Sequence, residues 1–461
     1  MKPYLRSIVV MERLGRTQAK GSIRNRTNLR GSVFALILLL DSAAYAAAPG
    51  LSRAEQRIVV AATAEDERAI AFLETLVNIN SGTMNLAGVE QVGQIMSAQL
   101  QPLGFTTRWH SMSAVGRAGH LIAAHRGSGH GKRLLLIGHL DTVFEKDSPF
   151  QRYQRRGNTA EGPGVSDMKG GLAIMVSALR ALQTAGALHD VNVTIVLDGD
   201  EENAGIPLSV SRADLIEAGK NADVALEFEP LATEDGHDMG SVSRRGDVDW
   251  TLRTSAESGH SSEVFSAAAG FGASYELTRI LDAFRRELRE PNATYNVGLV
   301  LSGSSANLND QATGGSASGK PNVISAQGLA RGDLRTLSNE QTARLEDRMR
   351  TVVADHLVGT HAEIQFDEGY QAMAPTPGNR ALLARLNEIN AEIGLEQMAE
   401  LDPLKRGAGD ISFVADRVDG LVGFGAAGHG LHAPGETADL SSFDRQIKRA
   451  ALLIERLSQI R

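Results

Sequence analysis

Several short groups of polar residues in this chain have the side chains that metal-assisted hydrolysis requires. Imidazole nitrogens and carboxylate oxygens suit zinc, and the chain contains no cysteine, so a metal would have to be held by His, Asp and Glu. Burying many carboxylates together without a cation is very unfavourable, so a metal is their natural counter-charge. The groups are His139-Leu-Asp141, Gly162–Gly171 with Asp167 inside it, Asp198–Glu202, Phe228-Glu229-Pro230 and Gly428–Glu436.

Neighbouring residues within these groups can take different roles. Asp141 lies two residues after His139, on the same side of an extended segment, where it can accept the second imidazole N–H and fix the tautomer. Glu201 and Glu202 are adjacent, so one can bind a metal while the other faces the substrate as a general base. Each group alone has a simpler interpretation as loop polarity, solvated surface or turn chemistry. Their common position favours a metal site, because nearly every group follows an apolar strand-like run.

The elements that must position these residues alternate between strands and helices from about residue 66 to 240. Apolar runs predict buried strands, and apolar residues spaced three and four apart predict helices. The strands are expected over 133–137, 191–197 and 223–228, and the helices over 70–76 and 172–182. This alternation predicts an α/β fold with a mainly parallel central sheet. Ligands of such sheets bind beyond the carboxyl ends of the strands, so the polar groups should converge there.

The pattern changes near residue 243, where Val248, Trp250 and Leu252 alternate with polar residues as in a half-buried strand. Further helices are expected over 274–289 and 340–356, and further strands over 295–301, 323–334 and 362–366. Residues 302–320, rich in Gly, Ser and Asn, are expected to form a mobile loop. Helical patterns return over 381–393 and 442–460. We therefore predict a catalytic domain in two parts, 47–242 and 373–461, interrupted by an α+β domain over 243–372.

The first 46 residues have the order of a secretory signal, with basic residues, the apolar run Ser32–Leu40 and small residues ending at Ala46. Translation could also begin at Met11. The alternative is a permanent anchor, but the apolar run is shorter than the roughly 20 residues that span a bilayer, so no stable membrane span is predicted. A periplasmic or secreted protein is expected. Without this segment the net charge is −14, which argues against a nucleic-acid partner.

At the polar groups the sequence resembles the co-catalytic zinc peptidase family of bacterial glutamate carboxypeptidases, aminoacylases and succinyl-diaminopimelate desuccinylases, and most of all the secreted glutamate carboxypeptidases. The matching motifs are Gly138–Val143 for an S-H-M-D-T-V segment, G-P-G-V-S-D-M-K-G-G, D-E-E, F-E-P and a late histidine. The resemblance implies two zinc ions per subunit and a cis peptide after Asp167. It favours His432 over His429, because His432 directly precedes Ala-Pro-Gly-Glu. It assigns His139 and Glu229 to one zinc, Glu202 and His432 to the other, Asp167 to both, Glu201 as general base and Asp141 as partner of His139.

The resemblance also makes residues 243–372 a dimerisation domain. His260, preceded here by Gly259 where the family has Ser, would reach the other subunit's active site and stabilise the oxyanion. Asn322 and Arg335 would line the substrate pocket. One departure concerns glutamate preference, because glutamate-specific relatives have a Gly-Arg pair where this chain has Asp367-Glu368-Gly369-Tyr370.

The predicted function is hydrolysis of the amide bond to a C-terminal amino acid, in a peptide or an N-acyl amino acid. The alternatives are a deacylase or an aminopeptidase on the same scaffold and, from another class, an exported binding protein without turnover. Three further histidines, His120, His125 and His130, are expected at the surface. The pair Arg244-Arg245 is either an anion-binding site or a solvated turn.

Overall fold

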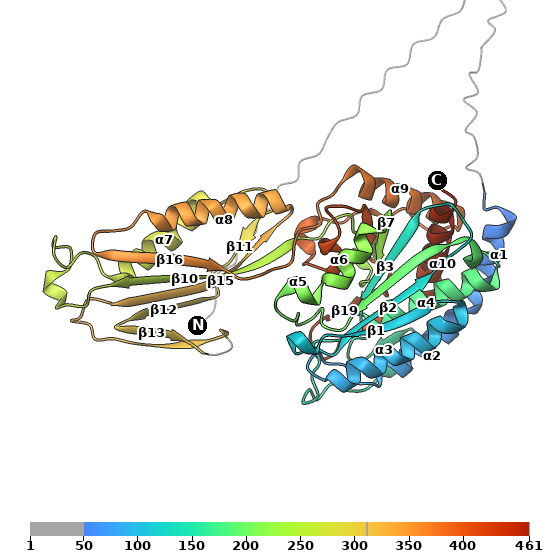
Figure 1. Ribbon diagram of the computed structural model, residues 1–461, viewed down its shortest axis with the longest axis horizontal. Coiled ribbons are helices and arrows are strands. Elements are labelled where there is room, and N and C mark those ends of the chain that lie inside the picture. Colours follow the sequence, from blue (N-terminus) through green and yellow to red (C-terminus); the bar gives the residue numbers. More distant parts are fainter. Residues whose placement is uncertain (1–49, 310–311, 461) are drawn as a thin grey trace, which may run out of the picture. The chain divides into compact units, whose positions relative to one another are not determined.

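The computed structural model describes residues 50–309 and 312–460, and two separate sheets carry most of its architecture (Figure 1). The predicted signal segment, residues 1–46, lies outside the described residues. One sheet has six strands and contains the predicted strands that precede the polar groups. The other sheet is antiparallel, and its strands lie within residues 246–256 and 294–366.

The six-stranded sheet presents four parallel strand ends at one edge. Its order is β1 (Thr106–Ser111), β2 (Gly119–His125), β6 (Asn192–Asp198), β3 (Arg133–His139), β7 (Val224–Glu227) and β18 (Gly420–Val422). β6, β3, β7 and β18 run parallel, whereas β1 and β2 are antiparallel to their neighbours. The predicted α/β fold with a mainly parallel sheet is therefore confirmed. The strand ends at His139, Asp198 and Glu227 are the points where the polar groups begin.

A hydrophobic core covers each face of this sheet, and alternate side chains of β3 contact the two cores. Leu134 and Leu136 point into the larger hydrophobic core, whereas Leu135 and Ile137 point into a smaller core on the opposite face, as period-two alternation requires. The larger core is shared with α1 (Arg53–Ala64), α2 (Asp66–Val77), α3 (Leu86–Leu100), α4 (Lys169–Thr184), α9 (Pro377–Glu392) and α10 (Ser442–Ser458). The smaller core is shared with α5 (Leu208–Ser211), α6 (Ala213–Lys220) and the turn Asp410–Phe413.

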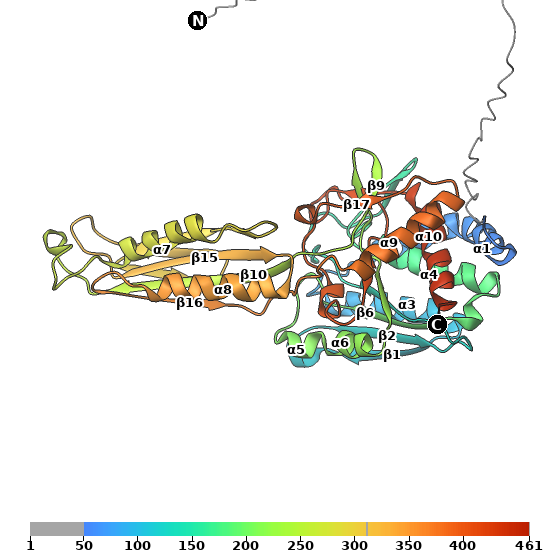
Figure 2. The ribbon, with the colours of Figure 1, turned by 90° about the horizontal axis from the view of Figure 1, so that it is seen from above.

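The antiparallel sheet has the order β11 (Thr294–Tyr295), β15 (Gln327–Thr336), β10 (Gly246–Ala256) and β16 (Thr360–Phe366), with β12 (Leu299–Gly303) also beside β15. Figure 2 shows α7 (Ala273–Glu287) and α8 (Asn339–Ala354) lying along this sheet. Trp250 is fully buried there and meets the ring of Phe284 edge-on, with the centroids 5.9 Å apart. These elements agree with the α+β pattern expected over 243–372, and the exact domain boundaries stay a prediction.

Three smaller sheets complete the architecture. The four strands β4 (Gln154–Arg156), β5 (Thr159–Glu161), β20 (Thr437–Asp439) and β19 (Gly428–His429) carry the loop with His432. A three-stranded sheet joins β8 (Ala232–Glu234), β9 (His237–Gly240) and β17 (Ala399–Glu400). Among the helices of residues 50–309 and 312–460, none is long and apolar enough to cross a membrane.

The expected mobile loop over 302–320 is wrong in its larger part. β13 (Ser305–Leu308) and β14 (Gly315–Ser318) form an antiparallel hairpin, and the hydroxyls of Ser305 and Ser318 are hydrogen bonded at 2.8 Å. The ladder is made by backbone groups, which do not depend on apolar side chains. A composition of Gly, Ser and Asn therefore hid two paired strands.

Candidate active site

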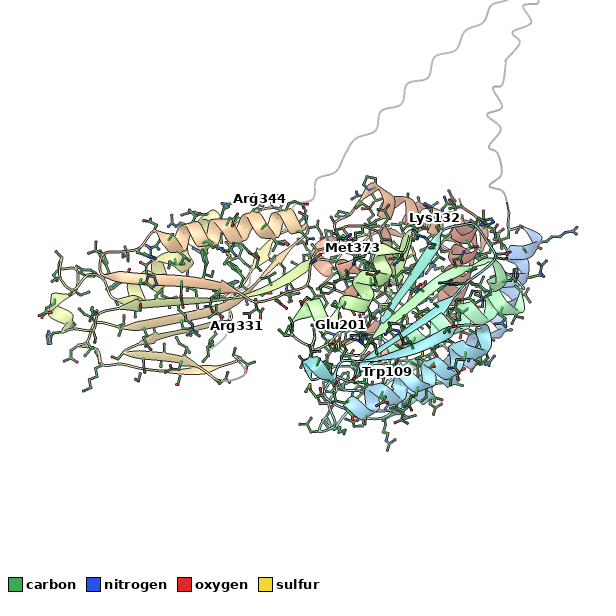
Figure 3. The ribbon with its side chains drawn as sticks, in the orientation of Figure 1. Trp109, Lys132, Glu201, Arg331, Arg344 and Met373 are labelled. Carbon is green, nitrogen blue, oxygen red and sulfur yellow. The ribbon has the colours of Figure 1, made fainter. Side chains whose placement is uncertain are left out.

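The strand ends and the loops beside them bring all five predicted metal ligands together. His139 ends β3, Glu229 follows β7, and Glu202 lies in the loop after β6, where Glu201 is labelled in Figure 3. Asp167 lies two residues before α4, and His432 lies in the loop between β19 and β20. The topology of parallel strands accounts for the convergence of His139, Glu202 and Glu229, whereas Asp167 and His432 are brought in by the loops.

Asp167 lies between two sets of candidate ligands. His139 Nε2 is 3.2 Å from Asp167 Oδ1 and 3.2 Å from Glu229 Oε1. His432 Nε2 is 3.2 Å from Asp167 Oδ2 and 3.3 Å from Glu202 Oε2. Each carboxylate oxygen of Asp167 therefore belongs to a different set, which is the arrangement of a bridging ligand.

The charges of these side chains fit bound cations. Burial, together with neighbouring carboxylates, raises the pKa of Glu201 and of Glu202 well above the usual value. One oxygen of Glu202 is buried and has no hydrogen-bond partner among the described residues. Imidazole nitrogens and carboxylate oxygens are a suitable donor set for a zinc-type ion, and such a cation would compensate the crowded negative charge.

Asp141 connects the predicted metal ligand His139 to the loop of Glu201 and Glu202. The Nδ1 atom of His139 lies 3.1 Å from the Asp141 carbonyl oxygen and 3.4 Å from its carboxylate. The same carboxylate accepts the backbone N–H groups of Glu201 and Glu202, each at 3.1 Å, and the Thr83 hydroxyl at 2.6 Å. Asp141 thus orients an imidazole and also fixes the main chain of the two glutamates. Thr83 was not identified from the sequence, where an isolated threonine carries no signal.

Glu436 fixes the loop that presents Asp167. Its carboxylate is fully buried and accepts the backbone N–H groups of Gly164 at 3.0 Å, Ser166 at 2.8 Å and Asp167 at 2.9 Å. Burial raises its pKa to about 7. Gly164 adopts a φ of +69°, a conformation that glycine adopts without strain. The peptide bond after Asp167 is cis, as the resemblance implied.

Two arginines border Glu229, one of the predicted metal ligands. Arg244 is buried, and both terminal nitrogens donate to Glu229 Oε2 at 3.2 Å, so the interpretation as a solvated turn is wrong for this residue, while binding of a ligand anion stays a prediction. Arg406 donates to the Pro230 carbonyl, while its Nε is buried with no partner among the described residues. Burial, with the nearby charge of Arg244, lowers the pKa of Arg406 to about 10. Its position before Gly407 in a run of small residues was the only signal in the sequence.

The three predicted residues of the antiparallel sheet region do not join this cluster within the described chain. His260 is exposed, with Nδ1 2.7 Å from the Ser262 hydroxyl. Asn322 lies beside it and accepts the Ser261 N–H through its carbonyl oxygen at 3.0 Å. Arg335 forms ion pairs with Asp247 at 2.9 Å and Asp333 at 2.8 Å. Their proposed roles in catalysis stay predictions.

The surface position predicted for the three extra histidines is wrong for His120. It is fully buried, donates from Nε2 to the Ser211 carbonyl at 2.8 Å and accepts the Gly199 N–H at Nδ1, 3.0 Å away. β2 lies between β1 and β6, so a residue on its inward face cannot reach solvent. His125 is half-buried beside the Val191 carbonyl, and His130 is exposed as predicted.

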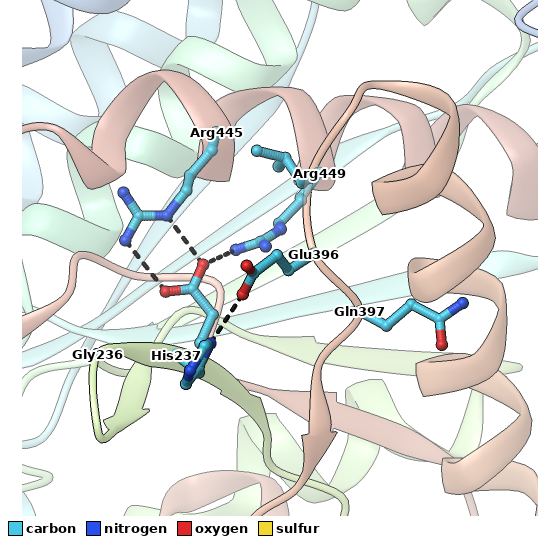
Figure 4. Close-up of a pocket in the computed structure, with 8 residues that line it drawn as sticks. Gly236, His237, Glu396, Gln397, Arg445 and Arg449 are labelled. Carbon is cyan, nitrogen blue, oxygen red and sulfur yellow. Dashed lines mark hydrogen bonds and ion pairs between the residues drawn. The ribbon is translucent and has the colours of Figure 1, made fainter. Parts of the chain in front are cut away.

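A separate hollow near β9 and α10 has its charges already paired (Figure 4). Arg445 and Arg449 both donate to the Asp238 carboxylate, at 2.9 and 2.5 Å. His237 lies 2.7 Å from Glu396 at the rim. The Asp238 pairs join the β8–β9 hairpin to α10, and the His237–Glu396 pair joins it to the segment after α9, so each charged residue described as lining the hollow has a partner.

Comparison with known proteins places this site in a family. The family model for peptidase family M20/M25/M40 matches residues 135–456. Carboxypeptidase G2 of Pseudomonas sp. (strain RS-16) is 27% identical over 444 residues, which cover 93% of this chain and 98% of that protein. A succinyl-diaminopimelate desuccinylase of Novosphingobium aromaticivorans is 28% identical over 376 residues, covering 77% and 91%.

Solved structures share the fold. Aminopeptidase PepT of Bacillus cereus has a TM-score of 0.65 at 15% identity and covers 85% of this chain and 98% of its own. The YXEP protein of Bacillus subtilis, described as a dinuclear metal-binding peptidase, has a TM-score of 0.59 at 16% identity and covers 86% and 99%. The family match, the relatives and the clustered ligands make this protein a metal-dependent hydrolase. The chain belongs to peptidase family M20/M25/M40.

Proposed function

We propose that this protein is a dizinc exopeptidase that hydrolyses the amide bond to a C-terminal amino acid. The observation that carries the proposal is the pair of ligand sets that share Asp167, whereas Glu201 lies only in a third group, with His139 and Glu202. His139 and Glu229 would hold one ion, and Glu202 and His432 the other. When bound, two such ions polarise the scissile carbonyl and acidify water.

Glu201 is proposed as the general base. It takes a proton from the attacking water and returns it to the leaving nitrogen. Burial and the surrounding carboxylates raise its pKa, which strengthens its hold on that proton. Asp141 supports this role because it accepts the Glu201 N–H and faces the His139 imidazole.

Arg406 is proposed to bind the free carboxylate of the substrate. Its Nε is a buried donor without a partner among the described residues, and its side chain lies next to the segment of Glu229. A guanidinium suits a carboxylate in both charge and geometry. It could replace the arginine that the glutamate-specific relatives carry at the end of the strand and that residues 367–370 lack here. The preferred side chain of the C-terminal residue is left open.

The active enzyme is proposed to be an exported homodimer. The resemblance supports dimerisation through residues 243–372, with His260 of one copy serving the site of the other. The exposed position of His260, away from the ligands of its own chain, is consistent with that role. The basic and apolar pattern of residues 1–46 supports export to the periplasm or medium.

Hydrolysis assays on zinc-loaded protein test the proposal. We expect turnover of N-acyl amino acids and peptides with a free C-terminal carboxylate, and much less of the matching C-terminal amides. Glu201→Gln should retain metal and fold yet lose most turnover, and near-normal turnover in this variant would exclude the base assignment. Arg406→Met should raise KM for the free acids far more than for the amides.

The same assays separate the alternative functions. A deacylase or an aminopeptidase on this scaffold is supported by the names of the desuccinylase relative and of PepT. A strict need for a free N-terminal amine would indicate an aminopeptidase, and preference for one acyl group a deacylase. Binding without turnover of any of these substrates would indicate a binding protein.

A further inference from the structure

The segment that replaces the expected Gly-Arg pair contacts the catalytic loop. Tyr370 lies between β16 and α9, on the stretch that returns from the antiparallel sheet. It pairs with the start of β10, since the Asp247 N–H donates to the Tyr370 carbonyl at 3.0 Å. Its ring meets Phe413 edge-on, with centroids 5.0 Å apart. Tyr370 is therefore held by backbone pairing on one side and by ring packing on the other.

The Tyr370 hydroxyl forms hydrogen bonds with the backbone of Glu201 and with the buried Arg212 side chain. It donates to the backbone carbonyl of Glu201 at 3.0 Å and accepts a hydrogen bond from Arg212 Nη2 at 2.6 Å. A phenol has one proton to donate, and this proton is used on Glu201. The hydroxyl thus reaches the main chain of the proposed base and forms no hydrogen bond with its carboxylate among the described residues.

Arg212 keeps this hydroxyl in place and fixes the residue before the base. It is fully buried and donates from Nε to Asp410 at 2.8 Å and from Nη1 to Asp200 at 2.6 Å. Its Nη2 also donates to the Asp200 carbonyl at 3.1 Å. The second oxygen of Asp200 accepts the Gly205 N–H at 2.8 Å, which closes the loop on itself.

Glu201 is consequently held from both sides of its main chain. Its N–H donates to Asp141 at 3.1 Å, and its carbonyl accepts from Tyr370. The first bond connects Glu201 to Asp141, which faces the predicted metal ligand His139. The second connects Glu201 to the segment that follows the last strand of the antiparallel sheet. We infer that Tyr370 is a positioning residue, which sets the place of Glu201 from the segment joining the two sheets. This inference rests on the proposed role of Glu201 as base.

The hydroxyl can be tested apart from the ring. Phenylalanine at position 370 would keep the packing against Phe413 and remove only the bonds to Glu201 and Arg212. Tyr295 offers a matched control, because its hydroxyl donates to the Phe284 carbonyl at 2.7 Å within the antiparallel sheet region. Tyr370→Phe and Tyr295→Phe therefore each remove one hydroxyl–carbonyl hydrogen bond, and Tyr370→Phe also removes the bond from Arg212.

Steady-state kinetics on the zinc-loaded full chain is the first measurement. A lost hydrogen bond corresponds to about a fivefold to tenfold change in rate when it acts on the reacting geometry. We expect Tyr370→Phe to lower kcat by that factor with KM changed less than about twofold. Tyr295→Phe should leave both parameters within about twofold of the parent. An unchanged kcat, or a change in KM alone, would overturn the inference.

Amide hydrogen exchange is the second measurement, and it does not depend on turnover. The N–H groups of Glu201, Glu202 and Gly205 are all hydrogen bonded in the catalytic loop. Tyr370→Phe should speed exchange over residues 199–205, and Tyr295→Phe should not. Unchanged exchange in Tyr370→Phe would overturn the inference that the Tyr370 hydroxyl fixes this loop. If the parent protein hydrolyses none of the substrates, the proposed function fails, while this exchange measurement still decides whether Tyr370 fixes the loop.

Discussion

Replacing Thr83 by valine isolates one hydrogen bond in the layer behind the metal ligands. Thr83 is 1% exposed, and its hydroxyl donates to Asp141 Oδ2 at 2.6 Å. Valine has nearly the same shape, so the substitution removes the donor without opening a cavity. Asp141 would keep its bonds to the backbone of Glu201 and Glu202 but lose its only side-chain hydroxyl donor among the described residues.

The size of the effect follows from the charge of the acceptor. A hydrogen bond to a buried carboxylate stabilises by about 1.5–3 kcal/mol, compared with about 1 kcal/mol for a neutral pair. We therefore expect Thr83→Val to lower the free energy of unfolding by about 2 kcal/mol. Since about 1.4 kcal/mol corresponds to a factor of ten, a looser Asp141 should weaken metal affinity or turnover by about 10- to 100-fold.

Thr254→Val is the matched control. The Thr254 hydroxyl is also buried, but it donates to the neutral carbonyl of Ala273 at 2.9 Å in the antiparallel sheet region. This variant should lose about 1 kcal/mol of stability and retain metal affinity and turnover. Urea unfolding, zinc competition with a chromogenic chelator and steady-state kinetics measure the three quantities. Metal affinity and kcat within twofold of the parent in Thr83→Val would refute the assigned role of Asp141.

Further predictions concern pH, charge and metal. The bonds from Arg344 and Arg348 lower the pKa of Glu290 to about 2, so its stabilisation is full above pH 4.5 and is lost as the pH falls towards 2. Glu290→Gln should therefore destabilise by about 1 kcal/mol at pH 7, with a difference from the parent that shrinks in urea unfolding at pH 3. Burial and Asp410 raise the pKa of Asp198 well above its usual value of 3.8, so the parent loses stability as the pH rises from about 4. Asp198→Asn should lose less stability over the same rise in thermal unfolding, and parallel curves would contradict this. Dialysis against a chelator should lower the thermal midpoint while far-ultraviolet circular dichroism stays unchanged, and calorimetric titration should then take up two zinc ions per chain; uptake of one ion would contradict the shared role of Asp167.

The candidate ligands could be predicted because of the regularity of parallel sheets. Buried strands of such sheets read as continuous apolar runs, so their ends are visible in the sequence as the points where polar residues begin. His139 and Glu229 were located in this way, and topology then places them at one edge of the sheet. The choice of His432 over His429 came from resemblance alone, and the geometry agrees, since His432 Nε2 faces both Asp167 and Glu202.

The residues that were missed act through contacts between distant parts of the chain. Thr83 and Asp141 are 58 positions apart, and Tyr370 and Glu201 are 169 apart. No periodicity or composition marks Thr83 or Tyr370 as a partner of these motif residues, because each is an ordinary residue of its own segment. The hairpin within 302–320 was missed for a related reason, as its strands are held by backbone pairing and not by an apolar face.

The ligand loops share one design, in which a buried group of the protein holds a predicted metal ligand in place. Asp167 is held through the three N–H groups that Glu436 accepts, Glu229 through Arg244, and Glu202 through Asp141. None of these bonds needs an ion, and each supporting group is at least nine-tenths buried. Burying the carboxylates close together costs free energy, and the other interactions of folding offset this cost. A bound cation would then offset a further part of it. We therefore expect tight metal binding and only a modest dependence of the fold on metal.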